Sequence, residues 1–176
     1  MSAEVPKQID EQREKESRLA TLYEEYFDKI AHYIYVRIGD RNEAEDLAGN
    51  VFLKALESLK SYKERGIPMQ AWLFKIAHNA SVDHLRKRGR VTSVPIEKVT
   101  IMAREDPAAV AETNLEIEKV REAMQKLTPD QREVVQLRFF GGLSSKDVGA
   151  ILRKSDGAVR EMQRAAVEKL RTLLDW

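Results

Sequence analysis

Clustered basic side chains are the first feature of this sequence that could do chemistry, and that chemistry is the binding of anions. Within the five residues "RKRGR", Arg86, Lys87, Arg88 and Arg90 are basic. Their charges suit the phosphates of a nucleic-acid backbone. The formal net charge of the chain is only +1 at pH 7, because acidic stretches such as residues 105–118 balance the basic ones. The local field therefore indicates more about partners than the total charge does.

A second candidate site is the stretch from Leu143 to Leu170, which has the pattern of a helix-turn-helix. Gly149 permits two helices to cross closely, and Val159 is an apolar residue ten positions later that packs at the crossing. The first turns of the second helix would face the DNA major groove, where Arg and Gln bond base edges and amides bond phosphate. The candidates there are Ser155, as the helix N-cap, Arg160, Gln163 and Arg164. A helical hairpin with a solvated basic face is the alternative interpretation.

The sequence offers no candidate for covalent catalysis or for a metal site. It contains no cysteine, which excludes a thiolate nucleophile, a disulfide and a Cys-rich zinc site. His78 and His84 are six residues apart, do not share a helical face and have no third ligand near them. No Ser-His-Asp set, Walker loop or pair of buried carboxylates is apparent, so we expect neither an enzyme nor a cofactor.

Apolar residues at three- and four-residue steps predict helices throughout the chain, and strand signals are almost absent. The first three predicted helices extend from Ser17 to Ile38, from Asn42 to Leu59 and from Met69 to Gly89. Further helices are predicted from Leu115 onward. The buried stripe of the second helix is predicted to contain Leu47, Val51, Phe52, Ala55, Leu56 and Leu59. In the last part of the chain, a helix from Pro129 to Phe140 should end at Gly141 and Gly142, and Ser144 should cap the helix that follows.

These elements predict an all-α protein with two small helical domains. The domains are expected over residues 18–90 and 115–176, with the helix-turn-helix in the second one. A flexible linker over residues 91–114 should join them, because that segment contains Pro95 and Pro107 and lacks periodicity. Residues 1–17 form a charged lead-in without the apolar core of a signal peptide, and no apolar run is long enough to span a bilayer. We therefore expect a cytoplasmic protein without membrane insertion.

Three stretches resemble the extracytoplasmic-function (ECF) group of bacterial sigma factors, which are sigma-70-like subunits of RNA polymerase. They are "AEDLAGNVFLKALESLKSY", "MQAWLFKIAHNASVDHLRKRGR" and "LTPDQREVVQLRFFGGLSSKDVGAILRKSDGAVREMQRAAVEKLRTLL". The resemblance covers about residues 19–174, and its two halves occur in the order and spacing of the family. The resemblance implies a dissociable, non-catalytic subunit that binds core RNA polymerase, recognises the minus-ten and minus-thirty-five promoter elements and opens DNA.

The resemblance assigns core-polymerase binding to the second helix. Asp46, Leu47 and Phe52 match the family's segment that binds the clamp helices of the largest polymerase subunit. Gly49 and Asn50 stand where the family usually has Gln and Glu, so two expected polar contacts are missing, and Gly49 costs about 1 kcal/mol of helix propensity. The family further implies the flap of the second-largest subunit and an anti-sigma factor as protein partners.

Minus-ten recognition is assigned by the resemblance to the third helix and to the loop over residues 61–68. This loop resembles the family's loop that holds a base flipped from the opened strand. Asn79 offers two donors and an acceptor for reading an exposed base edge, and the basic residues near it suit phosphates. The minus-ten candidates are Tyr62, which could stack on a base, Asn79, Asp83, Arg86, Lys87 and Arg88.

The second half departs from the family at two positions. Arg153 occupies a turn position usually held by Gly, so a left-handed backbone there would cost about 1 kcal/mol. Ala165 replaces a common Arg, which leaves Arg160 and Arg164 as the main basic contacts to the minus-thirty-five element. The alternative function is a helix-turn-helix regulator that binds DNA without being a polymerase subunit. Such a regulator would need a dimerisation surface, so gel filtration should give a dimer for it and a monomer for a sigma factor.

Overall fold

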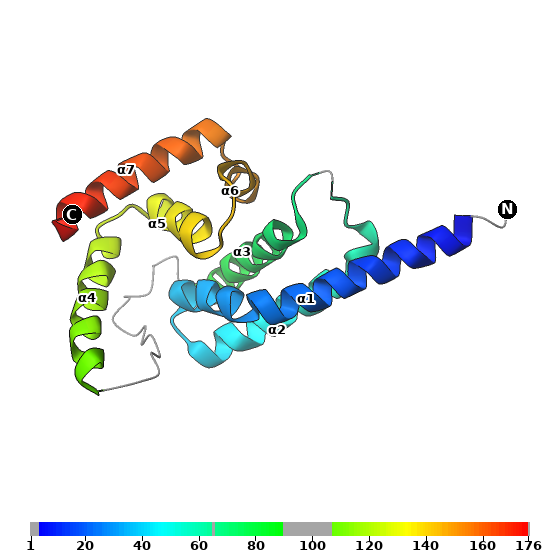
Figure 1. The fold of residues 1–176 in the computed structure, drawn as a ribbon, viewed down its shortest axis with the longest axis horizontal. Coiled ribbons are helices and arrows are strands. Elements are labelled where there is room, and N and C mark those ends of the chain that lie inside the picture. The colour runs from blue at the N-terminus through cyan, green and yellow to red at the C-terminus, as the bar shows by residue number, and fades with distance from the viewer. Residues whose placement is uncertain (1–3, 65, 90–106, 176) are drawn as a thin grey trace. The chain divides into compact units, whose positions relative to one another are not determined.

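The computed structural model describes residues 4–64, 66–89 and 107–175, and these residues form helices joined by short turns (Figure 1). Within these ranges no strand occurs. The chain divides into two compact units, residues 1–92 and 93–176. The prediction of an all-α protein with two helical bodies is therefore confirmed. The part of the predicted linker over residues 91–106 lies outside the described residues.

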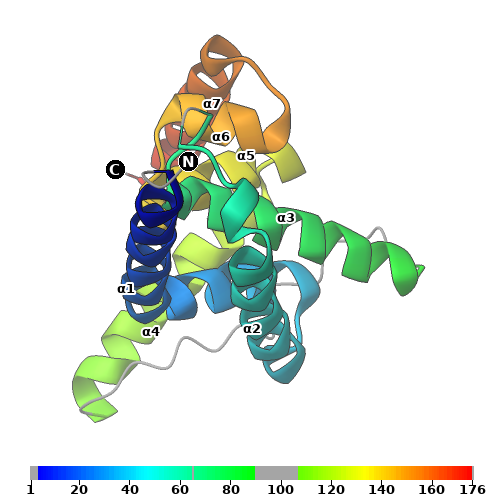
Figure 2. The same cartoon turned by 90° about the vertical axis from the view of Figure 1, so that its right-hand side faces the viewer.

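The first unit consists of α1 (Glu4–Ile38), α2 (Arg41–Glu57), the short 3-10 helix η1 (Leu59–Ser61) and α3 (Met69–Lys87). Each of the three long helices packs against the other two, as Figures 1 and 2 show. The core between them is apolar and includes Leu19, Ile30, Ile34, Val51, Phe52, Leu59, Met69, Leu73 and Phe74. This core fixes the faces that α2 and α3 present to solvent.

The turn between α1 and α2 shows how the sequence ends one helix and starts the next. Gly39 has φ +78, a left-handed conformation that residues with a side chain rarely adopt, and it ends α1. Asp40 follows as the N-cap of α2, and its carboxylate accepts a hydrogen bond of 3.0 Å from the amide of Glu43. The chain therefore reverses over two residues, which lets α2 pack back against α1.

Two features of the first unit differ from the sequence predictions. Helix α1 begins at Glu4 and not at Ser17, so the predicted charged lead-in is helical from Glu4 onward. These turns lack an apolar stripe, but they are rich in good helix formers and contain an ion pair of 3.2 Å between Lys15 and Glu11. Leu56 was expected in the buried stripe of α2, yet 50% of it is exposed because the α2 contacts are made by its neighbours Val51 and Ala55.

The second unit consists of α4 (Pro107–Gln125), α5 (Pro129–Val135), the π-helix η3 (Gln136–Phe140), α6 (Ser145–Leu152) and α7 (Asp156–Leu174). Helix α7 contacts α4, α5 and α6. The core of the second unit includes Leu127, Val134, Leu137, Leu143, Val148, Ile151, Val159 and Ala166. Because α4 begins at Pro107, the end of the predicted linker, residues 107–114, is helical.

Side-chain caps define the starts of the short helices in the second unit. Ser144 accepts from the amide of Asp147 at the start of α6, and Ser155 accepts from the amide of Ala158 at the start of α7, each at 3.1 Å. The predicted caps are thus confirmed. The predicted helix Pro129 to Phe140 is continuous but changes type, since the Gly141 amide donates to the Gln136 carbonyl, which is an i to i+5 bond of 3.0 Å.

None of the helices in the described ranges has the length and apolarity needed to cross a membrane. Across the same residues, no group of three or more His, Asp and Glu side chains could hold a metal ion.

Candidate nucleic-acid interface

The turn between α6 and α7 forms a tight helix-turn-helix. A Cβ atom on Gly149 would lie 2.5 Å from the carbonyl oxygen of Lys154, so only glycine fits there. The Lys154 amide donates to the Gly149 carbonyl at 2.9 Å, and Arg153 between them has φ 55 and ψ 44. Arg153 is therefore left-handed, the case in which a residue other than glycine costs about 1 kcal/mol at this position. Val159 is fully buried beneath the crossing. The predicted helix-turn-helix is confirmed.

The first turns of α7 carry the predicted minus-thirty-five residues in defined positions. Ser155 caps the helix by accepting from the Ala158 amide, and the amides of the first turn give this end a partial positive charge. Arg160 is exposed and forms an ion pair of 3.0 Å with Asp156. Gln163 is half-buried and accepts a hydrogen bond of 2.7 Å from Arg138 Nε. The structure thus brings Arg160 and Gln163 onto one groove along α7, lined also by Arg138, Arg164, Val167, Glu168, Arg171 and Thr172.

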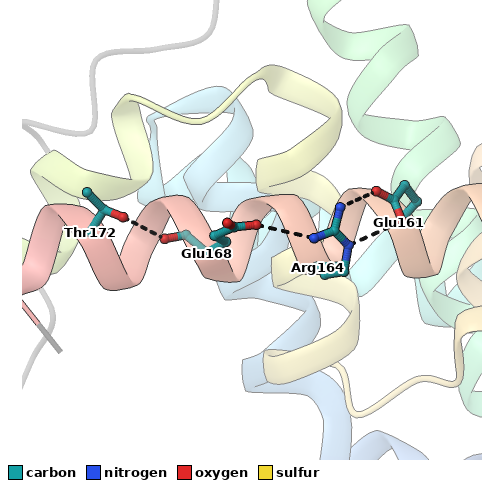
Figure 3. Close-up of polar contacts among 4 residues, drawn as sticks. All are labelled: Glu161, Arg164, Glu168 and Thr172. Atoms are coloured by element: carbon teal, nitrogen blue, oxygen red, sulfur yellow. Dashed lines mark hydrogen bonds and ion pairs between the residues drawn. The ribbon is translucent and has the colours of Figure 1, made fainter.

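Arg164 lies between two carboxylates on the same helix (Figure 3). Its Nη2 lies 2.6 Å from Glu161 Oε1 and its Nη1 lies 3.3 Å from Glu168 Oε2. The hydrogen bond and the charge of Arg164 lower the pKa of the Glu161 carboxyl, which stays ionised. Both arginines predicted to contact DNA are therefore paired with acidic residues of α7.

Arg138 was missed by the sequence reasoning. It lies on the π-helix η3. Its Nε donates a hydrogen bond to Gln163 Oε1, and its Nη1 donates one to the carbonyl oxygen of Leu143. It therefore ties the start of the helix-turn-helix to the recognition helix α7. Its partner on α7 is 25 residues away in the sequence, and no local pattern marks such a pair.

The predicted minus-ten residues of α3 lie along its exposed C-terminal half. Asn79, Asp83, Arg86 and Lys87 are all exposed. Asp83 Oδ1 lies 3.9 Å from Arg86 Nη1, a distance at which the pairing is weak. The positive charges of Arg86 and Lys87 are therefore largely available to a binding partner. The buried face of the same helix includes Leu73, Phe74, Ile76 and Ala77.

Glu43 of α2 contacts two side chains at the end of α3. Its Oε2 lies 3.1 Å from His84 Nε2, and its Oε1 pairs with Arg88. Arg88 was predicted to contact DNA phosphates together with Arg86 and Lys87. In this structure part of its charge is compensated by Glu43, while Arg86 and Lys87 extend from the last turn of α3.

Tyr62 is a packed residue in this structure. It is 5% exposed, its ring stacks on Trp72 with centroids 4.7 Å apart, and its hydroxyl donates to the Ile67 carbonyl at 2.9 Å. Burial raises the pKa of this hydroxyl. The contact of Tyr62 with a flipped base stays a prediction, and the described contacts give it the role of fixing the start of the loop.

The face of α2 predicted to bind polymerase has both polar and apolar exposed residues. Asp46 is exposed and Leu47 is half-buried, whereas Phe52 lies in the core with its ring 5.0 Å from that of Tyr23. Two apolar residues that the sequence analysis did not assign to polymerase binding are exposed to solvent on α2: Leu53 at 58% and Leu56 at 50%. Leu53 is seven residues after Asp46, so both lie on the same side of the helix.

Comparisons with known proteins support both halves of this arrangement. The family model for Sigma-70 region 2 matches residues 22–91, and the model for Sigma-70, region 4 matches residues 123–172. The ECF RNA polymerase sigma factor BldN of Streptomyces coelicolor is 35% identical over 156 residues, which are 87% of this chain and 59% of BldN. SigD of Mycobacterium tuberculosis, another ECF sigma factor, is 30% identical over 81% of this chain and 70% of SigD.

A solved structure gives the same result for the fold. The sigma factor RpoE of Bartonella quintana, crystallised with the anti-sigma factor NepR, matches with a TM-score of 0.69 and 26% identity. The match covers 89% of this chain and 96% of the RpoE chain. The similarity therefore extends over both units and is not limited to the helix-turn-helix.

Proposed function

The chain belongs to the ECF RNA polymerase sigma factors, with sigma-70 regions 2 and 4, and from this premise we propose that it directs core RNA polymerase to the promoters of a specific regulon. Sigma factors of this group are non-catalytic subunits that direct transcription initiation. The observation that carries the proposal is the pairing of a tight helix-turn-helix in one unit with an exposed, basic α3 end in the other. We also propose a cytoplasmic location, where the polymerase acts.

Minus-thirty-five recognition is proposed for Ser155, Arg160, Gln163 and Arg164. The N-terminal end of α7 offers amides to a phosphate, and the exposed guanidinium groups suit guanine edges in the major groove. Arg160 and Arg164 would exchange their carboxylate partners for DNA. Gln163 accepts a hydrogen bond from Arg138 Nε, which orients its side-chain amide.

Minus-ten recognition is proposed for Asn79 and its neighbours on α3. Asn79 is exposed and can pair with a base edge, and Arg86 and Lys87 follow it as a basic path for the backbone. Asp83 and Arg88 complete this surface, with Arg88 partly neutralised by Glu43. Tyr62 supports the adjoining loop through its stacking on Trp72.

Core-polymerase binding is proposed for the exposed side of α2. Asp46 supplies a charge, and Leu53 and Leu56 supply apolar area that a helical partner could cover. Leu47 borders this side, and Phe52 supports it from the core. The finer partners, namely the clamp helices and the flap of the polymerase, belong to this proposal. So does an anti-sigma factor, since RpoE of Bartonella quintana was solved with one.

The experiment that tests the proposal is reconstituted transcription. The full chain is mixed with core polymerase, and unpaired thymines are detected with permanganate on a duplex promoter and on one with a pre-melted bubble. Asn79→Ala should lower opening on both templates and alter the preference for minus-ten sequences, because Asn79 acts in base recognition. Wild-type opening by Asn79→Ala on every minus-ten variant would contradict the assignment.

Asp46→Ala and the pair Arg160→Ala and Arg164→Ala separate the other two surfaces. Asp46→Ala should weaken a pull-down of core polymerase while circular dichroism stays unchanged, because Asp46 is exposed. Each arginine variant should weaken holoenzyme binding to promoters that need the minus-thirty-five element by roughly 1 to 3 kcal/mol. A chain that forms a stable dimer and binds duplex DNA without polymerase would instead be a helix-turn-helix regulator.

A further inference from the structure

Helix α1 extends beyond the part of the chain that the family model covers. The Sigma-70 region 2 match begins at residue 22, while α1 begins at Glu4. Figure 1 shows these N-terminal turns of α1 continuing past the rest of the first unit. Two cations in this extension, Lys15 and Arg18, make contacts with a segment more than forty residues away in the sequence.

Both contacts are made to the loop that follows η1. Lys15 Nζ donates to the carbonyl oxygen of Tyr62 at 3.1 Å, and its side chain is only 19% exposed. Arg18 Nη2 donates to Glu64 Oε1 at 2.8 Å. The hydrogen bond and charge of Arg18 lower the pKa of the Glu64 carboxyl, so the pair is ionised over the whole neutral range. Thus one helix holds the loop at two points, two residues apart.

The same loop is held on its other side by α3. The Tyr62 ring stacks on Trp72, and the Tyr62 hydroxyl donates to the Ile67 carbonyl, which lies just before α3. Tyr62 is therefore fixed through its ring, its hydroxyl and its backbone carbonyl at once. Of these three, the backbone contact comes from Lys15, which sets the direction of the chain as it leaves Tyr62 toward Glu64.

We propose that Lys15 and Arg18 are positioning residues, which hold the segment Tyr62–Glu64 in the place from which the loop takes part in minus-ten recognition. The inference rests on the proposed role of this loop and of α3 in binding the opened strand. It adds to that role a specificity element on the extension of α1, in residues before the start of the region 2 match.

The exposure of the ion pair favours positioning over a role in stability. The Arg18 and Glu64 side chains are 40% and 62% exposed, and such surface pairs add little to the free energy of unfolding. A direct contact of Arg18 with DNA phosphate is the competing role. The two roles differ in one respect, because a positioning pair tolerates exchange of its two charges, whereas a phosphate contact requires the cation at position 18.

The test uses the full chain in holoenzyme and measures promoter opening over a set of minus-ten variants. Arg18→Ala and Lys15→Met should each reduce the discrimination between preferred and altered minus-ten sequences by roughly tenfold, the size of one lost base contact. The doubly changed chain Arg18→Glu with Glu64→Arg should recover the discrimination lost in Arg18→Glu alone. Arg13→Ala, an exposed cation on the same helix, is the matched control and should behave as wild type.

A spectroscopic measurement separates loop position from folding. In a Trp176→Phe background the emission reports on Trp72 alone, which stacks on Tyr62. Lys15→Met and Arg18→Ala should alter this emission while the thermal midpoint stays within error of the parent chain. Unchanged discrimination in both variants, with a wild type that does discriminate, would overturn only this inference. A wild-type holoenzyme without any minus-ten preference would overturn the proposed function as well, and failure of the exchanged pair would favour a phosphate contact.

Discussion

A hydrogen atom in place of a side chain at Gly149 decides whether α6 and α7 can meet. Because a Cβ there would lie 2.5 Å from the Lys154 carbonyl oxygen, Gly149→Ala must displace the backbone of the turn. Overpacking of this kind costs about 1–3 kcal/mol, against a gain of about 1 kcal/mol in helix propensity. We expect a lower unfolding midpoint of the second unit, measured by calorimetry.

Gly157 provides the matched control for that substitution. It lies in the first turn of α7, and a Cβ there would have no heavy atom within 4 Å. Gly157→Ala should therefore be neutral or stabilising by up to about 1 kcal/mol. Equal midpoints for the two alanine variants would contradict the steric role of Gly149.

His32 gives the first unit a pH dependence of known sign. Burial lowers the pKa of His32 in the folded state below its ordinary value of 6.5. Between the two pKa values the unfolded chain binds more protons than the folded one. The contribution of neutral His32 to the free energy of unfolding is therefore fully present above pH 6.5 and is lost as the pH decreases below it. Urea unfolding between about pH 5.5 and 7.5 should show this slope in the wild type. His32→Gln should flatten it, and an unchanged slope would show that another group is responsible.

At the scale of the elements, the capping serine of the recognition helix is the feature most open to test. Ser155 satisfies the amide of Ala158 at 3.1 Å, and its loss leaves that donor without its partner. Ser155→Ala should destabilise the second unit by about 1 kcal/mol, whereas Ser155→Asp should retain most of the stability. Chemical unfolding followed by circular dichroism measures both. An alanine variant as stable as the aspartate variant would mean that the cap contributes nothing.

The helices that could be predicted from the sequence are those whose signals are local. The caps Ser144 and Ser155, the stop at Gly39 and the close approach at Gly149 all depend on residues within one or two turns, and the structure contains each of them. The predicted start of α1 at Ser17 was wrong, because residues 4–16 carry no apolar stripe and are helical through propensity and side-chain pairs. The change to a π-helix at Gln136 was also not predicted, because such single turns are rare and five residues are too few to show a periodicity of their own.

The candidate sites show the same division between local and distant signals. Asn79, Arg86 and Arg160 could be selected because a residue type and a helix position suffice to predict exposure, and all three are exposed. Leu56 was misplaced because a leucine at the border of a helical stripe is covered or exposed according to its tertiary neighbours. The pair of Arg138 and Gln163 joins residues 25 apart, and only the folded chain brings them together.

For the whole molecule, the division into two units predicts separate responses to core substitutions. Each unit buries its own set of apolar residues, with Leu73 in the first and Val148 in the second fully buried. Leu73→Ala should cost the first unit about 2–5 kcal/mol, because it leaves a cavity. Calorimetry should then show one transition at a lower temperature and the other unchanged, with Gly149→Ala giving the converse pattern. A single transition that shifts with either substitution would contradict two independent units.

The length of α1 has a consequence for how its backbone exchanges hydrogen with solvent. At 1.5 Å per residue, its 35 residues extend over about 52 Å, yet the first buried residue on it is Leu19. The turns before Lys15 therefore open at little cost in free energy, while amides beyond Leu19 open only with the packed core. Hydrogen exchange should show a boundary close to Lys15, with amides exchanging fast before it and slowly after it. Lys15→Met should move that boundary toward Leu19. One unbroken helix thus contains two stretches whose backbone hydrogen bonds have very different lifetimes.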